Sequence, residues 1–256
     1  MIKRHRIQFP STDVRELSQD EVYFYLLDEQ GRRTKIRLHE YDRLYRIPGL
    51  YEQVVYERLK CQSPTVVTDV LKYTLSQSDQ RLTELRLLDI GAGNGIVGEE
   101  LKKYGVSRLI GIDIIPEARD AAERDRPGVY DAYYVMDLCS LTAEEREEIT
   151  SWSPDCLISV AALGFGDIPP QAFLEAFNLI SKQGWVAFNI KESFLDRSDT
   201  SGFSILIREL ISSKYLDLYH LQRYRHRLSL EGRPLYYFAL GGKKNHHVPS
   251  SFIEAF

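Results

Sequence analysis

The fold is decided by residues 85–98, which read Leu85-Arg86-Leu87-Leu88-Asp89-Ile90-Gly91-Ala92-Gly93-Asn94-Gly95-Ile96-Val97-Gly98. The apolar residues up to Ile90 predict a short buried strand. Glycines then occupy every second position from Gly91 to Gly95, and an amphipathic helical pattern follows. Because glycine has no Cβ, such a turn can be tight and its backbone can lie against a ligand. The free N–H groups and the positive dipole end of the helix then face that ligand. The stretch therefore predicts a nucleotide-sized binding site at the carboxyl edge of a parallel sheet.

The glycines permit two registers. Gly93-x-Gly95-x-x-Gly98 satisfies the dinucleotide fingerprint, and Asp113 stands at about the spacing expected for a ribose-binding acid. That register, however, begins after the strand has already turned at Gly91. The register that starts at the turn places Asp89 just ahead of the first glycine. S-adenosylmethionine has no pyrophosphate, so its site needs close backbone approach and carboxylates rather than a phosphate cradle. On these residues the chain resembles the class I S-adenosylmethionine-dependent methyltransferases.

The resemblance implies an α/β fold, a Rossmann-like three-layer sandwich with a seven-stranded, mostly parallel sheet and an antiparallel C-terminal hairpin strand. Strand-like segments occur where that sheet needs them, at 85–90, 108–113, 130–136, 155–163 and 185–190, and again from 216 and at 235–240. A closing antiparallel pair suits this sheet and not the six-stranded parallel dinucleotide fold. The segment Gly128-Val129-Tyr130 and the loop 162–169 also look like the Williams–Beuren-region methyltransferase-like proteins.

We expect three parts along the chain. Residues 1–62 form an N-terminal arm, a β-hairpin and a helical lid, residues 63–242 form the methyltransferase core, and residues 243–256 form a polar C-terminal tail. The arm, residues 1–20, has no clear period. The hairpin is predicted because two strand-like runs, 21–27 and 34–38, flank a glycine-containing connection.

Composition limits the classes of function. The 256 residues suffice for one large α/β domain, and 43% hydrophobic with 27% charged residues is typical of a soluble globular protein. A net charge of −4 gives no indication of a nucleic-acid surface. No apolar run approaches the roughly 20 residues that cross a bilayer, and no apolar core follows the basic N-terminus as in a secretory signal. Three widely separated cysteines lack metal-ligand spacing, so we expect no metal and a cytoplasmic location with reduced thiols.

Two acids are expected to hold the cofactor. At the end of its strand Asp113 can accept both ribose hydroxyls, although it could instead cap the helix that begins at Pro116. The resemblance implies that Asp137 accepts from the adenine amino group and that the backbone of Leu138 serves the ring edge; the alternative for Asp137 is an ordinary loop residue. The resemblance also places the loop after the fourth strand beside the transferable methyl group. The predicted cofactor-binding residues are Asp89, Gly91, Ala92, Gly93, Gly95, Asp113, Ile114, Asp137, Leu138, Ala161, Tyr45 and Tyr51.

The tyrosines belong to a helical segment that Pro48-Gly49 divides in two. It looks like the aromatic-rich lid that closes over the cofactor in small-molecule methyltransferases. A tyrosine ring facing the sulfonium gains cation–π attraction of order 1 kcal/mol, for which Tyr45 and Tyr51 are the candidates. The alternative is that the tyrosines of this segment are packing residues on amphipathic helices.

The resemblance implies transfer of the sulfonium methyl by in-line displacement, for which the protein mainly supplies alignment and desolvation. The catalytic residue is unknown, with Asp167, Glu192 and His39 as candidate bases, each otherwise a surface or hydrogen-bonding residue. The loop that contains Asp167 lacks the Asn/Asp-Pro-Pro-aromatic motif of amino-directed DNA methyltransferases, which argues against base methylation. We therefore expect a small-molecule acceptor, no nucleic acid and no membrane, with the N-terminal hairpin as a candidate homodimer surface. The alternatives are a non-catalytic S-adenosylmethionine-binding protein and an NAD-dependent oxidoreductase.

Overall fold

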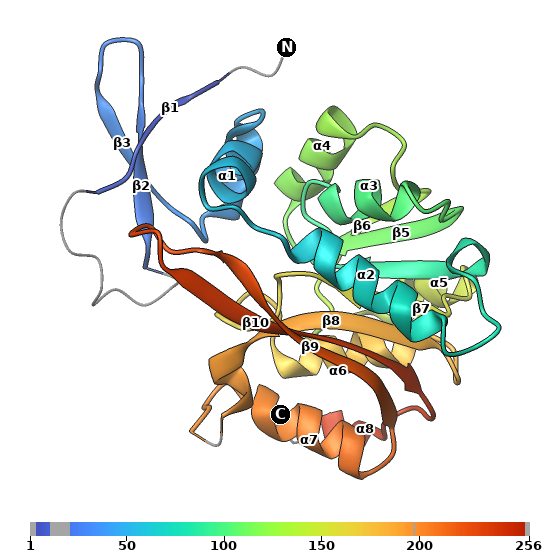
Figure 1. Ribbon diagram of the computed structural model, residues 1–256. Helices are drawn as coiled ribbons and strands as arrows, with labels where there is room; N and C mark the ends of the chain where they lie inside the picture. Colours follow the sequence, from blue (N-terminus) through green and yellow to red (C-terminus); the bar gives the residue numbers. More distant parts are fainter. Residues whose placement is uncertain (1–3, 11–20, 197, 254–256) are drawn as a thin grey trace.

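The computed structural model describes residues 4–10, 21–196 and 198–253 and has a central sheet of seven strands (Figure 1). In space the strands follow the order β6-β5-β4-β7-β8-β10-β9. Their bounds are β4 Arg86–Ile90, β5 Arg108–Asp113, β6 Ala132–Val135, β7 Cys156–Ser159, β8 Trp185–Lys191, β9 Leu216–Leu228 and β10 Pro234–Lys244. Neighbours from β6 to β8 are parallel, whereas β10 pairs antiparallel with both β8 and β9. The predicted α/β sheet with an antiparallel C-terminal hairpin is confirmed.

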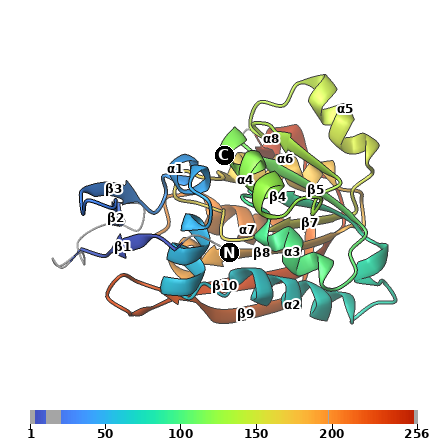
Figure 2. The same cartoon turned by 90° about the horizontal axis from the view of Figure 1, so that it is seen from above.

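Helices cover both faces of this sheet, which makes three layers (Figure 2). One face packs against α2 (Ser63–Leu75) and α3 (Ile96–Lys102). The other packs against α6 (Pro170–Leu179) and α7 (Phe203–Ser212), with α5 (Ala143–Ser151) and α8 (Ser250–Ile253) beside them. Strand β4 is buried on both faces. Leu87 belongs to the core under α2 and α3, and Leu88 belongs to the core under α6 and α7. Burial on both sides explains why the adjacent residues Leu87 and Leu88 are both apolar, although they point to opposite faces.

The C-terminal segment differs from the expected polar tail. Strand β10 continues to Lys244, whose side chain is fully buried, and Val248 is 3% exposed. The Val248 N–H donates to the Asn178 side chain at 2.9 Å, and the short helix α8 follows. The segment therefore closes the core beneath α6 rather than extending into solvent.

The N-terminal region forms a separate three-stranded antiparallel sheet, β1 (Arg6–Gln8), β2 (Tyr23–Leu27) and β3 (Arg33–Arg37). The expected hairpin is β2–β3. The strand β1 was not expected, because the sequence of the arm has no clear period. Residues 1–3 and 11–20 of that arm lie outside the described residues. This sheet has its own small core, in which Phe24 and Ile36 pack against Leu44, Leu50, Val54 and Leu59.

The lid follows the N-terminal sheet and consists of α1 (Tyr41–Arg46), the Pro48–Gly49 break and a π-helix, Glu52–Arg58. It lies against α4 (Pro116–Asp125), as Figure 1 shows. Arg46 forms an ion pair with Glu117, and the Arg124 guanidinium donates to the Tyr45 carbonyl at 2.9 Å. These bonds fix the lid above the carboxyl ends of the parallel strands. Within the described ranges, no helix is long and apolar enough to cross a membrane.

Candidate active site

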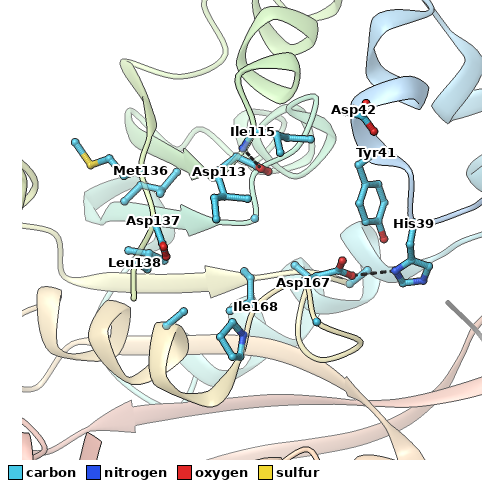
Figure 3. Close-up of a pocket in the computed structure, with 18 of the residues that line it drawn as sticks. His39, Tyr41, Asp42, Asp113, Ile115, Met136, Asp137, Leu138, Asp167 and Ile168 are labelled. Carbon is cyan, nitrogen blue, oxygen red and sulfur yellow. Dashed lines mark hydrogen bonds and ion pairs between the residues drawn. The ribbon is translucent and has the colours of Figure 1, made fainter. Parts of the chain in front are cut away.

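A cavity of about 590 Å³ lies at the carboxyl edge of the parallel strands, beneath the lid. It has the size of a small-molecule or cofactor site. Figure 3 shows Asp113 and Asp137 on the sheet side, with Tyr41 and His39 facing them from the lid. The structure brings together these predicted residues on its walls: Gly91, Asp113, Ile114, Asp137, Leu138, Ala161, Tyr45, Tyr51, His39 and Asp167. The wall does not include Asp89, Ala92, Gly93, Gly95 or Glu192.

The glycine turn has the left-handed backbone that favours glycine, with φ of +65° at Gly91, +54° at Gly93 and +84° at Gly95. It also has no room for side chains. A Cβ at Gly91 would lie 2.6 Å from the Ala162 Cβ, and one at Gly93 would lie 2.5 Å from the Tyr45 hydroxyl oxygen. Glycine is therefore needed here both for the backbone conformation and for close approach.

Asp113 joins the glycine turn to the start of α4. Its Oδ2 accepts from the Gly93 N–H at 2.9 Å and its Oδ1 from the Ile115 N–H at 3.2 Å. It does not cap the helix, since the N-cap of α4 is Ile115 and no side chain caps it. Burial raises the pKa of Asp113, while these backbone hydrogen bonds act in the opposite direction. Each carboxylate oxygen keeps capacity for a further donor that approaches from the cavity.

Asp89 supports the turn from below. It is fully buried, and its Oδ2 accepts from the Tyr130 hydroxyl at 2.7 Å. Its Oδ1 has no hydrogen-bond partner among the described residues. Burial raises its pKa to about 7. The sequence placed Asp89 against the cofactor, whereas in the structure it lies under the backbone that lines the cavity.

An apolar slot with a polar rim lies at the ends of β5 and β6. Met136 and the buried Leu138 line it, together with Ile114, whose 59% exposure is high for so large an apolar side chain. Asp137 lies at the rim, where it accepts from the Cys139 N–H at 2.8 Å and from the Ser140 hydroxyl at 3.1 Å. A planar ring inserted here would cover Ile114 and bring its edge to Asp137. Sequence reasoning missed Met136 and Cys139, which carry no signal beyond their position after the strand.

The lid contributes an aromatic wall. Tyr45 and Tyr51 have ring centroids 5.0 Å apart, and Tyr41 stacks on Tyr45 at 6.0 Å. All three line the cavity, so Tyr41, which the sequence did not single out, belongs with the other two. Burial raises the pKa of Tyr41 and of Tyr45 well above the usual value. The rings are therefore neutral and present their electron-rich faces or hydroxyl groups to the cavity.

Two of the candidate bases lie together at the wall. His39 Nδ1 is 3.1 Å from Asp167 Oδ2, across 128 positions of sequence (Figure 3). Both side chains are largely enclosed, at 16% and 25% exposure. The third candidate, Glu192, lies elsewhere and forms a bidentate pair with Arg223, which lowers its pKa. Of the three candidate bases, only His39 and Asp167 line the cavity.

A buried polar network leads away from the same wall. The Ala161 N–H donates to Asn189 at 2.6 Å, which holds Ala161 in a left-handed conformation with φ of +56°. Asn189 donates to the Tyr224 hydroxyl at 2.7 Å. The Ser63 hydroxyl then bonds to the Tyr224 hydroxyl at 2.7 Å and to His226 Nδ1 at 2.6 Å. A strained residue held by such a network is typical of functional sites.

Known proteins agree with this architecture. A methyltransferase domain model matches residues 88–188, from β4 to β8. A protein of Thermoplasma acidophilum shares the fold with a TM-score of 0.50 at 19% identity, covering 77% of this chain and 96% of its own. A candidate RNA methyltransferase from Pyrococcus horikoshii has a TM-score of 0.51 at 14% identity, covering 71% and 84%. An N-methyltransferase of Bradyrhizobium japonicum in complex with S-adenosyl-L-homocysteine has a TM-score of 0.49 at 15% identity, covering 71% and 87%. A comparison with curated proteins finds no match.

The residues of the site fit the cofactor of such a domain. A turn with glycine at every second position, a carboxylate at the end of β5 and an apolar slot with an acid at its rim suit the amino-acid, ribose and adenine parts of a nucleoside sulfonium. The turn, both acids and the slot all lie inside the matched segment. Residues 88–188 are therefore part of a methyltransferase domain with the class I fold, and S-adenosylmethionine is its cofactor.

Proposed function

We propose that this protein transfers the methyl group of S-adenosylmethionine to a small-molecule acceptor. The observation that carries the proposal is the position of the lid. The lid is bonded to α4 and to the glycine turn, and it lies over the cavity, where Tyr41, Tyr45 and Tyr51 form part of the wall. An acceptor that reaches the far wall must therefore fit beneath the lid, which favours a small molecule over a nucleic acid or a protein chain.

Within that space we assign the cofactor-binding roles to residues of the strand ends. Asp113 receives the ribose hydroxyls and Asp137 the adenine amino group, while the slot of Ile114, Met136 and Leu138 holds the ring. Tyr45 and Tyr51 face the sulfonium, where cation–π attraction is of order 1 kcal/mol. The cofactor supplies an electrophilic methyl group, so the protein has to align the acceptor and exclude water.

His39 is the group we assign to proton removal from the acceptor. When Nδ1 carries a hydrogen, it donates to Asp167, and Nε2 then presents the lone pair that accepts a proton. Asp167 fixes the ring orientation and stabilises the charged imidazole that results. His39 comes just before the lid and Asp167 lies in the loop after β7, so the pair joins two segments that are 128 positions apart in the sequence.

The protein is expected to act in the cytoplasm. Cys61, Cys139 and Cys156 are free thiols in the structure, which suits a reducing compartment. The N-terminal sheet remains our candidate for a homodimer surface, testable by sedimentation of the full chain.

Calorimetric titration with S-adenosylmethionine, S-adenosylhomocysteine and NAD tests the assignment. We expect the two sulfur ligands to bind and NAD not to bind. Asp113→Ala should weaken the sulfur ligands at least tenfold, which is about 1.4 kcal/mol. Asp69→Ala is the matched control, since Asp69 is exposed on α2, outside the cavity, and forms an ion pair with Lys72. Binding of NAD alone would reverse the assignment.

A further inference from the structure

A second, smaller cavity of about 40 Å³ adjoins the first. The two share a wall made of His39, Tyr41, Tyr51, Ala161 and Asp167. The smaller cavity therefore begins where the proposed base lies and extends away from the cofactor residues. Its far side is formed by the C-terminal strands β9 and β10, through His226, Arg227 and Tyr237, and by Cys61 after the lid.

Arg227 is the charged group of this far side. It is 6% exposed and lines the smaller cavity but not the larger one. Its Nη1 donates to the Leu228 carbonyl at 3.0 Å, a neighbour on the same strand. In the described part of the chain, no carboxylate lies within ion-pair distance of its guanidinium. Arginine is rarely buried without such a partner, because desolvating an uncompensated charge is costly.

The other residues around the smaller cavity do not supply the missing negative charge. Burial, with a further contribution from Arg227, lowers the pKa of His226 well below its usual value, so this imidazole is neutral. Burial raises the pKa of the Cys61 thiol, which therefore keeps its proton. Asp167 is the one carboxylate among the described lining residues, and its Oδ2 lies against His39.

We propose that Arg227 binds a carboxylate of the acceptor, so that the methyltransferase acts on a small carboxylic acid. The proposal rests on the proposed function and names its substrate class. A volume of about 40 Å³ corresponds to roughly three water-sized groups, which matches a planar carboxylate better than a hydrated phosphate. The fork of a guanidinium matches the two oxygens of a carboxylate. With the carboxylate on Arg227, the remainder of the acceptor lies against Tyr41, Tyr51 and Tyr237 and its nucleophile lies at His39.

The test follows the Arg227 side chain by nuclear magnetic resonance in the full chain saturated with S-adenosylhomocysteine. The Nε–H signal of Arg227 is identified by its loss in Arg227→Gln. The probes are acetate and benzoate, with neutral benzamide and inorganic phosphate as comparisons. We expect acetate and benzoate to shift the signal saturably, and benzamide to bind at least tenfold more weakly. Arg223→Gln is the matched control, because Arg223 lies on the same strand, is exposed and already pairs with Glu192; it should leave carboxylate binding unchanged.

Each result supports or overturns the proposal. Equal binding of benzamide and benzoate, no saturable shift with either carboxylate, or tighter binding of phosphate than of acetate would overturn it. So would a tenfold loss of S-adenosylhomocysteine affinity in Arg227→Gln, which would assign the arginine to the cofactor's own carboxylate. The comparison of benzoate with benzamide uses wild-type protein and holds even if the variant does not fold. Failure of S-adenosylhomocysteine itself to bind would instead contradict the proposed function.

Discussion

Asn94 donates its side-chain N–H to Glu52 at 2.6 Å, and this bond joins the glycine turn to the π-helix of the lid. The same Glu52 oxygen accepts from Arg126 at 3.0 Å, and Arg126 also donates to the Asn94 carbonyl. Both partners are enclosed, with Asn94 2% exposed and the Arg126 side chain 12% exposed. The Glu52 carboxylate thus links the lid to the glycine turn.

Removing that carboxylate should loosen the lid. In Glu52→Ala, the Asn94 side chain loses its acceptor and Arg126 keeps Glu99 and the Asn94 carbonyl, so we expect a loss of about 1–3 kcal/mol in unfolding free energy. S-adenosylhomocysteine should dissociate several-fold faster, as measured by stopped-flow fluorescence. Glu57→Ala, which removes an exposed partner of Arg4, is the control and should change neither quantity. An unchanged dissociation rate in Glu52→Ala would mean that the lid does not gate the site.

Gly93 can be tested against Gly128, because both have positive φ and only Gly93 is crowded. In Gly93→Ala and in Gly128→Ala the left-handed backbone should cost about 1–2 kcal/mol in unfolding free energy. Only the new Cβ of Gly93→Ala meets an atom, the Tyr45 hydroxyl oxygen, whereas Gly128 has nothing within 4 Å. We therefore expect Gly93→Ala alone to lose cofactor affinity in calorimetry. Adding Tyr45→Phe, which removes the clashing oxygen, should restore part of it; an additive double variant would contradict the steric explanation.

Asp89 should make stability fall with rising pH. Burial raises its pKa in the folded protein to about 7, above the usual 3.8 of an aspartate, so the folded state binds the proton more tightly than the unfolded state. The stabilisation is complete below about pH 4 and is lost as the pH rises to about 7, by roughly 4 kcal/mol at most. Denaturant unfolding of wild type and Asp89→Asn at pH 4.5 and 7.5 measures this. The wild type should lose several kcal/mol relative to the variant, and parallel pH profiles would show that Asp89 titrates normally.

The His39–Asp167 pair predicts a defect in turnover without a defect in cofactor binding. His39→Gln should lower methyl transfer by about 10²–10⁴-fold, the usual contribution of a positioned base. Asp167→Asn should have a smaller effect, since the imidazole remains but is less well oriented. The measurement is transfer of a tritiated methyl group from S-adenosylmethionine to carboxylic acids, alongside calorimetry. Glu192→Gln is the control, because Glu192 lies outside the cavity with Arg223. Normal turnover in His39→Gln would exclude it as the base.

The sequence predicted which strand-end residues meet at the cavity, because its signals are local. Gly91 directly follows β4, Asp113 ends β5 and Asp137 comes two positions after β6, and the ends of parallel strands meet at one edge of a sheet. The role of Asp89 could not be predicted, because its burial depends on Tyr130, 41 positions away. Nothing local distinguishes Asp89 under the turn from a carboxylate that faces the ligand.

The sequence did not predict the proposed acceptor site at Arg227, for a different reason. Arg227 stands in a run of polar and basic residues on β9 that has the composition of an exposed edge strand. Its burial arises only because Leu228 donates its backbone N–H to the Leu59 carbonyl at 2.7 Å and Gln62 donates to the His226 carbonyl at 2.9 Å. The spacing of residues in the sequence cannot predict contacts between the end of the lid and a strand more than half the chain away.

The position of β10 between β8 and β9 sets the order in which the two cavities can be built during synthesis. Strands β4 to β8 can assemble while the ribosome is still producing the last quarter of the chain. Strand β9 is made before β10 but joins the sheet only through it. Arg227, whose partner on β10 is Leu235, is therefore joined to the sheet only after β10 has been made. A nascent chain acquires the glycine turn early and its proposed acceptor selectivity last.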